Sequence, residues 1–135
     1  MESIKLTNGQ IEGIIQAKGT IETIKVSLPL KPAYWLARAI EKMRDLYKIY
    51  KGEQQSIIDA HALKKEDGTP QADSEGRVLW APGQEQIAGE KLKELAEIEE
   101  DLGINKIDIS KASDNFSVEN MLILMPLITE PKFEE

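Results

Sequence analysis

The side chains best suited to chemistry are one histidine and a few carboxylates near the middle of the chain. Asp59 and His61 are two residues apart, so on a helix they point to different faces and cannot readily form an acid–base pair. A single histidine leaves a Ser-His-Asp triad formally possible but excludes a site built from several histidines. The lack of cysteine excludes disulfides, thiolate metal sites and cysteine nucleophiles. We therefore interpret His61 as a partly buried structural residue.

Three carboxylates in one polar segment are the nearest approach to a metal site. Asp67, Asp73 and Glu75 could in principle meet a divalent cation. A calcium-binding loop, however, needs ligands at alternating positions, a central glycine and a terminal bidentate glutamate. Residues 69–71 interrupt that pattern, so a solvated turn is the better interpretation. The sequence also has no glycine-rich phosphate-binding loop, and we expect no metal, no cofactor and no enzymatic activity.

Charge is unevenly divided along the chain. Residues 1–65 hold eleven Lys/Arg and seven Asp/Glu, a net +4, whereas residues 66–135 hold six and seventeen, a net −11. Exposed faces of opposite sign are the more common explanation, but such a division also favours pairing between surfaces or between copies. The candidate interface residues are two tryptophans, two cations and four members of an acidic cluster, namely Trp35, Trp80, Arg38, Lys42, Glu94, Glu97, Glu100 and Asp101.

Partners other than proteins are not expected. The overall charge of −7 argues against a general nucleic-acid-binding protein. No apolar run reaches membrane-spanning length, and the N-terminus lacks the pattern of a signal peptide, so we expect no membrane contact. We therefore expect the partners to be proteins, including further copies of the chain in a homo-oligomer.

An apolar ladder predicts a long helix as the main element that positions these residues. Its rungs recur at steps of four and three with one gap, and they are Leu36, Ile40, Met43, Tyr47, Tyr50, Ile57 and His61. This spacing places them on one face of a helix that begins near Pro32 and ends near Leu63. A second apolar stripe predicts a helix over residues 84–102, ended by Gly103. The residues of this stripe are Ile87, Leu92, Leu95, Ile98 and Leu102. The two helices are natural antiparallel partners, with the acidic cluster near the end of the second.

Shorter elements complete the predicted fold. They are an edge strand over residues 4–6, a brief helix over 7–17 capped by Thr7, strands over 24–30 and 104–110 that could pair, a polar loop over 66–77, and a last helix over 118–125. We therefore predict an α+β fold, mostly helical: a long antiparallel helical hairpin with a small β-sheet of short strands and a short C-terminal helix. Residues 1–130 would form a single domain, and residues 131–135 a flexible acidic tail.

Five short segments follow one another along the chain in an order that is also found in other proteins. They are Ile4–Asn8, Leu36-Ala37-Arg38, Asp67-Gly68, Lys91–Leu95 and Leu124–Ile128. The chain resembles in this respect the small tailed-phage and prophage proteins of unknown function that are encoded among structural genes. The resemblance covers most of the chain and implies a non-catalytic protein that acts through protein–protein contacts. It would be a virion component of the tail or neck, or an assembly factor. The resemblance supplies no established functional residues.

The implied partners are phage structural proteins or further copies of the chain, in the host cytoplasm or the virion. An alternative is a phage-encoded acidic inhibitor that binds a host protein where nucleic acid would dock. A continuous acidic patch over Glu94–Asp101 that the long helix leaves unpaired would favour the inhibitor. Pairing of that patch with a second copy would favour assembly.

Overall fold

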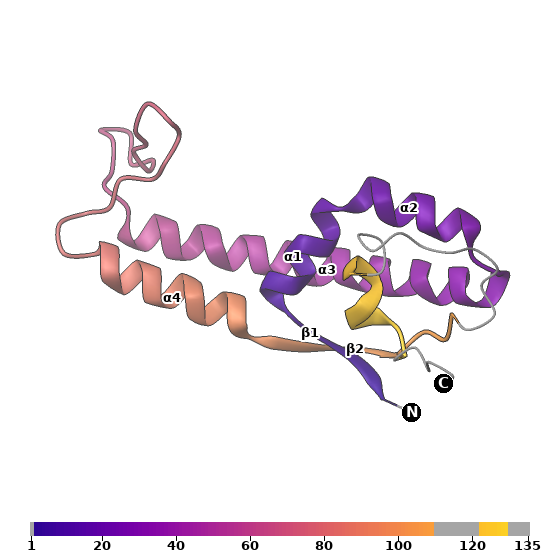
Figure 1. The fold of residues 1–135 in the computed structure, drawn as a ribbon. Helices are drawn as coiled ribbons and strands as arrows, with labels where there is room; N and C mark the ends of the chain where they lie inside the picture. The colour runs from indigo at the N-terminus through magenta and orange to yellow at the C-terminus, as the bar shows by residue number, and fades with distance from the viewer. Residues whose placement is uncertain (1, 110–121, 130–135) are drawn as a thin grey trace. The chain divides into compact units, whose positions relative to one another are not determined.

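The computed structural model describes residues 2–109 and 122–129. Its elements are β1 (Ser3–Thr7), α1 (Asn8–Gln16), α2 (Lys18–Ser27), α3 (Leu30–His61), α4 (Glu85–Glu97), β2 (Glu99–Asn105) and the 3₁₀ helix η1 (Met125–Leu127) (Figure 1). Residues 122–124 are helical and lead directly into η1. The predicted α+β, mostly helical fold is confirmed, with its helical hairpin, small sheet and short C-terminal helix.

The chain divides into two compact units. The terminal unit is Met1–Tyr47 with Glu99–Glu135, and the middle unit is Lys48–Ile98. The single domain predicted over residues 1–130 stays a prediction. The expected tail over 131–135 and the start of the expected helix over 118–125 lie outside the described residues.

A capping box joins the first strand to the first helix. The Thr7 hydroxyl oxygen accepts a hydrogen bond from the backbone N–H of Gln10 at 3.2 Å, and the Gln10 side-chain oxygen accepts one from the Thr7 N–H at 2.9 Å. These bonds satisfy donors that the start of a helix leaves without intrahelical partners. Ile11 and Ile14, three residues apart, then share the buried face of α1. The predicted strand over 4–6 and helix over 7–17 are confirmed.

The predicted strand over residues 24–30 is wrong, because this segment holds the end of α2 and the start of α3. Ile21 and Ile24 are three residues apart on α2 and are both buried, so they share the face that packs into the core. Val26 and Leu30, which a strand would place on the same side as Ile24, are both 85% exposed. The buried residues therefore follow the period of a helix and not of a strand. The first of them, Ile21, precedes the segment whose alternating apolar residues predicted the strand.

The long helix α3 begins and ends within two residues of its predicted boundaries. Pro32 lies in its first turn, where the missing N–H donor is not needed. The helix continues without a break through Gly52, although glycine is unfavourable in a helix interior. The ladder nevertheless belongs partly to each of the two units, because the chain divides between Tyr47 and Lys48.

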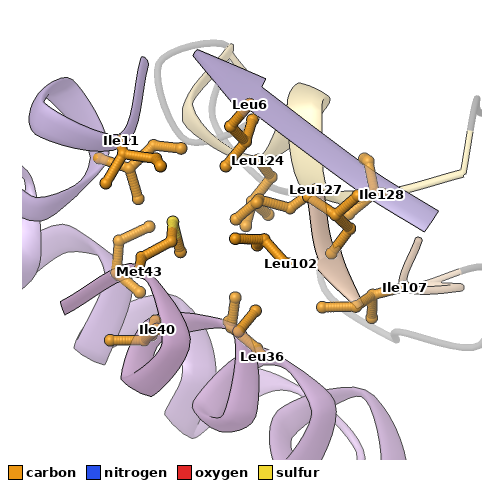
Figure 2. Close-up of a cluster of buried hydrophobic side chains, with 14 of the residues drawn as sticks. Leu6, Ile11, Leu36, Ile40, Met43, Leu102, Ile107, Leu124, Leu127 and Ile128 are labelled. Atoms are coloured by element: carbon orange, nitrogen blue, oxygen red, sulfur yellow. The ribbon is translucent and has the colours of Figure 1, made fainter. Parts of the chain in front are cut away.

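The N-terminal part of the ladder packs into the core of the terminal unit (Figure 2). Leu36, Ile40 and Met43 face apolar side chains from β1, α1, β2 and the segment around η1. The largest fully buried side chains of the described residues are Ile4, Leu6, Ile11, Ile24, Leu36, Met43, Leu124 and Leu127. The stripe predicted on the second helix therefore does not cover this part of the ladder. Of that stripe, only Leu102 belongs to the core, and it does so from β2.

β1 and β2 form an antiparallel sheet, so the predicted pairing of residues 104–110 with residues 24–30 is wrong. Lys5 lies opposite Asp101, and Ser3 lies opposite Asn105. Between these two pairs β1 advances by two residues and β2 by four, which makes a bulge on β2. Gly103 in this bulge has a φ of +67°, a conformation that glycine adopts without strain.

Helix α4 ends at Glu97, five residues before the predicted end, and the chain continues as β2. The shorter helix keeps Glu99, Glu100 and Asp101 out of its C-terminal turn, where carboxylates oppose the helix dipole. Strand pairing with β1 also carries Leu102 into the terminal core. A helical pattern in the sequence is thus overridden by a long-range sheet and by the burial of one leucine.

In the middle unit, α4 runs antiparallel beside residues 48–61 of α3, which confirms the predicted hairpin (Figure 1). The hydrophobic contact here is shallow. Within residues 48–98 only Tyr50, Ala62 and Ala88 are buried. Ile87 and Ile98 of the predicted stripe are 43% and 46% exposed.

The polar segment between α3 and α4 folds into two consecutive tight hairpins. Single β-bridges join Lys64 to Pro70, Ala72 to Val78 and Ala62 to Trp80. Residues 77–80 thus take part in two separate bridges, at Val78 and Trp80, and form no continuous strand. Gly68 and Gly76 occupy equivalent positions in the two turns, with φ values of +87° and +81°.

Candidate functional site

Two aromatic rings and one arginine form a surface cluster on α3, here termed the aromatic–arginine cluster. Trp35 is 46% exposed and Tyr34 is 51% exposed. Their rings meet edge to face with centroids 5.3 Å apart. The Arg38 guanidinium lies 6.0 Å from the centre of the Tyr34 ring and donates a hydrogen bond of 3.1 Å to its hydroxyl. The three side chains hold one another in place on a long helix.

Lys42 extends this cluster along the helix. Steps of four, three and four residues place Lys31, Trp35, Arg38 and Lys42 on one side of α3, and we define these four as the basic face. Arg38 and Lys42 also line a groove of about 560 Å³, together with Glu41, Asp45 and residues 102–104 of β2. Both signs of charge line the groove, so it suits a polar protein surface better than a small ion.

Two of the predicted acidic candidates lie on the exposed side of α4. Glu94 and Glu97 share it with Glu90, and we define the three as the acidic face. Steps of four and three place them on the side of the helix away from the buried Ala88. No salt bridge within the described part of the chain includes Glu94 or Glu97.

The other two acidic candidates lie on β2, so the prediction of one acidic helix over residues 94–101 is wrong. The Asp101 carboxylate accepts hydrogen bonds from the Gly103 N–H and the Ser3 hydroxyl, both at 2.9 Å. These bonds, the one from Gly103 first, hold the pKa of Asp101 below its ordinary value. Asp101 therefore stabilises the bulge of the sheet. Glu100 is half-buried and lies opposite Leu6.

Trp80 and His61 both have structural contacts within the middle unit. Trp80 is half-buried and pairs with Ala62 through one β-bridge. The Nδ1 atom of His61 lies 2.7 Å from the side-chain oxygen of Gln84, and its Nε2 atom lies 3.2 Å from the Nζ atom of Lys91. Lysine can only donate, so Nε2 accepts and Nδ1–H donates to Gln84. The His61 ring thus connects the end of α3 to Lys91 of α4 through Nε2, and to Gln84, the residue before α4, through Nδ1.

The carboxylates predicted as a weak metal site act as turn formers. Asp67 accepts hydrogen bonds from the Thr69 hydroxyl and backbone N–H, which lower the pKa of its carboxyl. Asp73 accepts from the backbone N–H groups of Glu75 and Arg77, each at 2.9 Å. These are the local side-chain bonds typical of Asp in tight turns. Among residues 2–109 and 122–129, no group of three His, Cys, Asp or Glu side chains could hold a metal ion.

Comparison with known proteins finds no family model, no curated protein and no solved structure that matches this chain. Within the described ranges, no helix is both long enough and apolar enough to cross a membrane.

Sequence reasoning found Trp35, Arg38 and Lys42 on the exposed side of α3 but missed Lys31 and Tyr34. The position of Tyr34, four residues before Arg38, was a usable signal, because side chains at that spacing meet on a helix. It also missed Glu90, which lies one helical turn before Glu94. The structure brings Trp35, Arg38 and Lys42 together in the terminal unit, whereas Glu94 and Glu97 belong to the middle unit.

Proposed function

We propose that this chain is a phage-encoded, non-catalytic protein that acts through protein–protein contacts, as a virion component of the tail or neck or as an assembly factor. The observation that carries this proposal is the exposed aromatic–arginine cluster of Tyr34, Trp35 and Arg38. Trp, Tyr and Arg are the side chains that most often dominate the binding energy of protein interfaces. Their mutual contacts restrain them before binding, which reduces the entropy lost when a partner docks.

The phage assignment rests on the resemblance carried by the order of the sequence segments. Of these segments, Leu36-Ala37-Arg38 lies on α3, Asp67-Gly68 lies in a tight turn, and Lys91–Leu95 lies on α4. The proposed partners are phage structural proteins or further copies of the chain. The proposed location is the host cytoplasm or the virion.

The acidic-inhibitor alternative has less support. It depends on one continuous acidic patch over Glu94–Asp101, whereas these acids are divided between α4 and β2. One of them, Asp101, has both carboxylate oxygens bonded within the sheet.

The test uses the phage or prophage that carries the gene. We expect deletion of the gene to reduce the yield of infectious particles, with defective tails or necks in electron micrographs. The double variant Trp35→Ala, Arg38→Glu should reproduce the defect, whereas Ile49→Ala, at an exposed position of the same helix, should not. Mass spectrometry of purified particles then separates a virion component, which is present, from an assembly factor, which is absent. A normal particle yield after deletion would contradict the proposal.

A further inference from the structure

We infer that the basic face of α3 docks on the acidic face of α4 from a second copy of this chain. This inference rests on the proposed function and deepens it, because it names both the partner and the two surfaces that meet. The two faces lie on different helices, so each copy has one of each kind.

The two faces have complementary charges. The basic face has three cations and the acidic face three carboxylates, namely Lys31, Arg38 and Lys42 against Glu90, Glu94 and Glu97. Within the described residues none of these six takes part in a salt bridge, and all six are exposed. Because the six side chains are exposed, their charges can attract an opposite surface, which speeds association and selects the partner.

Charges of the opposite sign lie beside each face. Glu41 and Asp45 lie next to Lys42 on α3, along the groove against β2. On α4, Lys91 lies within hydrogen-bond distance of the His61 ring, and Lys93 is exposed beside the acidic face. These groups favour one alignment of the two helices over others, because they would repel like charges in a shifted contact.

The two sides of the helices are also comparable in length, and both expose apolar groups. At 1.5 Å per residue the basic face, from Lys31 to Lys42, extends about 16 Å, and the acidic face, from Glu90 to Glu97, extends about 10 Å. Ile87, three residues before Glu90, lengthens that side of α4 to about 15 Å. Each side also exposes large apolar groups, the rings of Trp35 and Tyr34 on α3 and the side chain of Ile87 on α4. Paired helices in proteins combine an apolar contact with flanking ion pairs in this way.

The contact uses two different surfaces, so it is heterologous. A heterologous contact leaves one free face of each kind on every pair, and repetition produces a closed ring or an open filament. One helix against another is a small interface, so the association should be weak and should decrease as salt screens the charges.

The test compares two charge-reversal variants of the full-length chain by analytical ultracentrifugation. One variant carries Arg38→Glu and Lys42→Glu, and the other carries Glu90→Lys and Glu94→Lys. The matched control, Lys48→Glu with Lys65→Glu, makes the same net charge change as the first variant at other exposed positions. Circular dichroism on each variant shows whether the helices are retained.

We expect the wild-type chain and the control to form oligomers that dissociate at high salt. Each charge-reversal variant alone should associate at least about tenfold more weakly than the wild-type chain, because two copies of the same variant repel each other at the proposed contact. An equimolar mixture of the two folded variants should associate again, because each then meets a face of opposite charge. Failure of the mixture to associate, or a wild-type chain that is monomeric at high concentration and low salt, would overturn the inference.

Failure here is distinguishable from failure of the proposed function. A monomeric chain that is still required for normal particles contradicts only the pairing of copies. A chain that assembles as described but whose gene is dispensable for particles contradicts only the proposed function.

Discussion

The two units of this chain differ in what stabilises them. The terminal unit buries large aliphatic side chains from every described element, with Leu36 and Met43 of α3 almost inaccessible to solvent. The middle unit buries one tyrosine and two alanines, and relies on turns, β-bridges and the bonds of His61. Burial of apolar area contributes about 25 cal/mol per Å², so the terminal unit has the larger hydrophobic stabilisation.

The difference teaches that a uniform sequence pattern need not have a uniform role. The rungs of the ladder share one face of α3 in both units, although the ladder has a gap at Gln54 in the middle unit. Its N-terminal rungs insert into a core made by several elements, whereas Ile57 and His61 are only half-buried beside a single helix. What covers a helical stripe depends on elements far away in the sequence.

The largest expected effect is on a core isoleucine of α3. Ile40→Ala should lower the free energy of unfolding by about 2–5 kcal/mol, because it removes buried methyl groups and leaves a cavity. Ile49→Ala makes the same chemical change on the same helix, where the side chain is 64% exposed, and should change stability by less than about 0.5 kcal/mol. Urea unfolding of both variants measures the difference. Equal losses would contradict the burial assigned to these two positions.

A smaller effect is expected when the shallow contact of the middle unit is overfilled. Ala88 is fully buried on α4, so Ala88→Leu should destabilise by about 1–3 kcal/mol through overpacking. Hydrogen exchange should show faster exchange in α4 than in the core of the terminal unit. The neighbouring Gly89→Ala serves as control, because nothing lies within 4 Å of the added methyl group. It should stabilise the exposed helix by about 0.5–1 kcal/mol.

Two glycines with open surroundings should respond in opposite directions to the same substitution. Gly103 has a positive φ in the bulge of β2, so Gly103→Ala should destabilise the terminal unit by about 1 kcal/mol. Gly52 is helical in α3, so Gly52→Ala should stabilise the protein by about 0.5–1 kcal/mol. Thermal unfolding of the two variants measures the sign. Stabilisation by Gly103→Ala would contradict the left-handed conformation at the bulge.

The smallest effect is a dependence of stability on pH at the sheet. The pKa of Asp101 is lowered in the folded state, so its contribution to stability is complete well above the unfolded value of 3.8. The contribution is lost as the pH falls below 3.8 and through the lower folded pKa. Asp101→Asn should therefore reduce this acid sensitivity. The control Asp73→Asn removes a carboxylate from the middle unit and should leave the acid response of the terminal unit unchanged, as followed by NMR.

Local patterns predicted the elements that local physics can form. The Thr7 cap, the long ladder and the Asp67-Gly68 turn depend on neighbouring residues, and each was found at or near its predicted place. The predictions were wrong where contacts with residues outside the segment determine its secondary structure. Residues 24–27 became helix because Ile21 and Ile24 bury together, and residues 99–105 became strand because β1 offers a pairing edge.

The candidate site followed the same rule. Trp35, Arg38 and Lys42 share a helix face, and the helical spacing was enough to place them together. The acidic cluster from Glu94 to Asp101 did not keep one helical face, because its last residues pair with β1. The exposure of Trp35 and the partial burial of Trp80 also lay beyond sequence reasoning, since both tryptophans precede or begin a helix in similar apolar surroundings.

By itself, the sequence determined the helical hairpin, the capped first helix, the tight turns and the separation of basic from acidic residues. Each follows from bonds and side-chain spacings within a few residues. Only the tertiary structure decided that the first part of the ladder joins a core with β1 and η1, and that Leu102 enters that core from a strand. The physical reason is that burial and strand pairing reward contacts between residues about a hundred positions apart, such as Lys5 and Asp101, to which no local pattern refers.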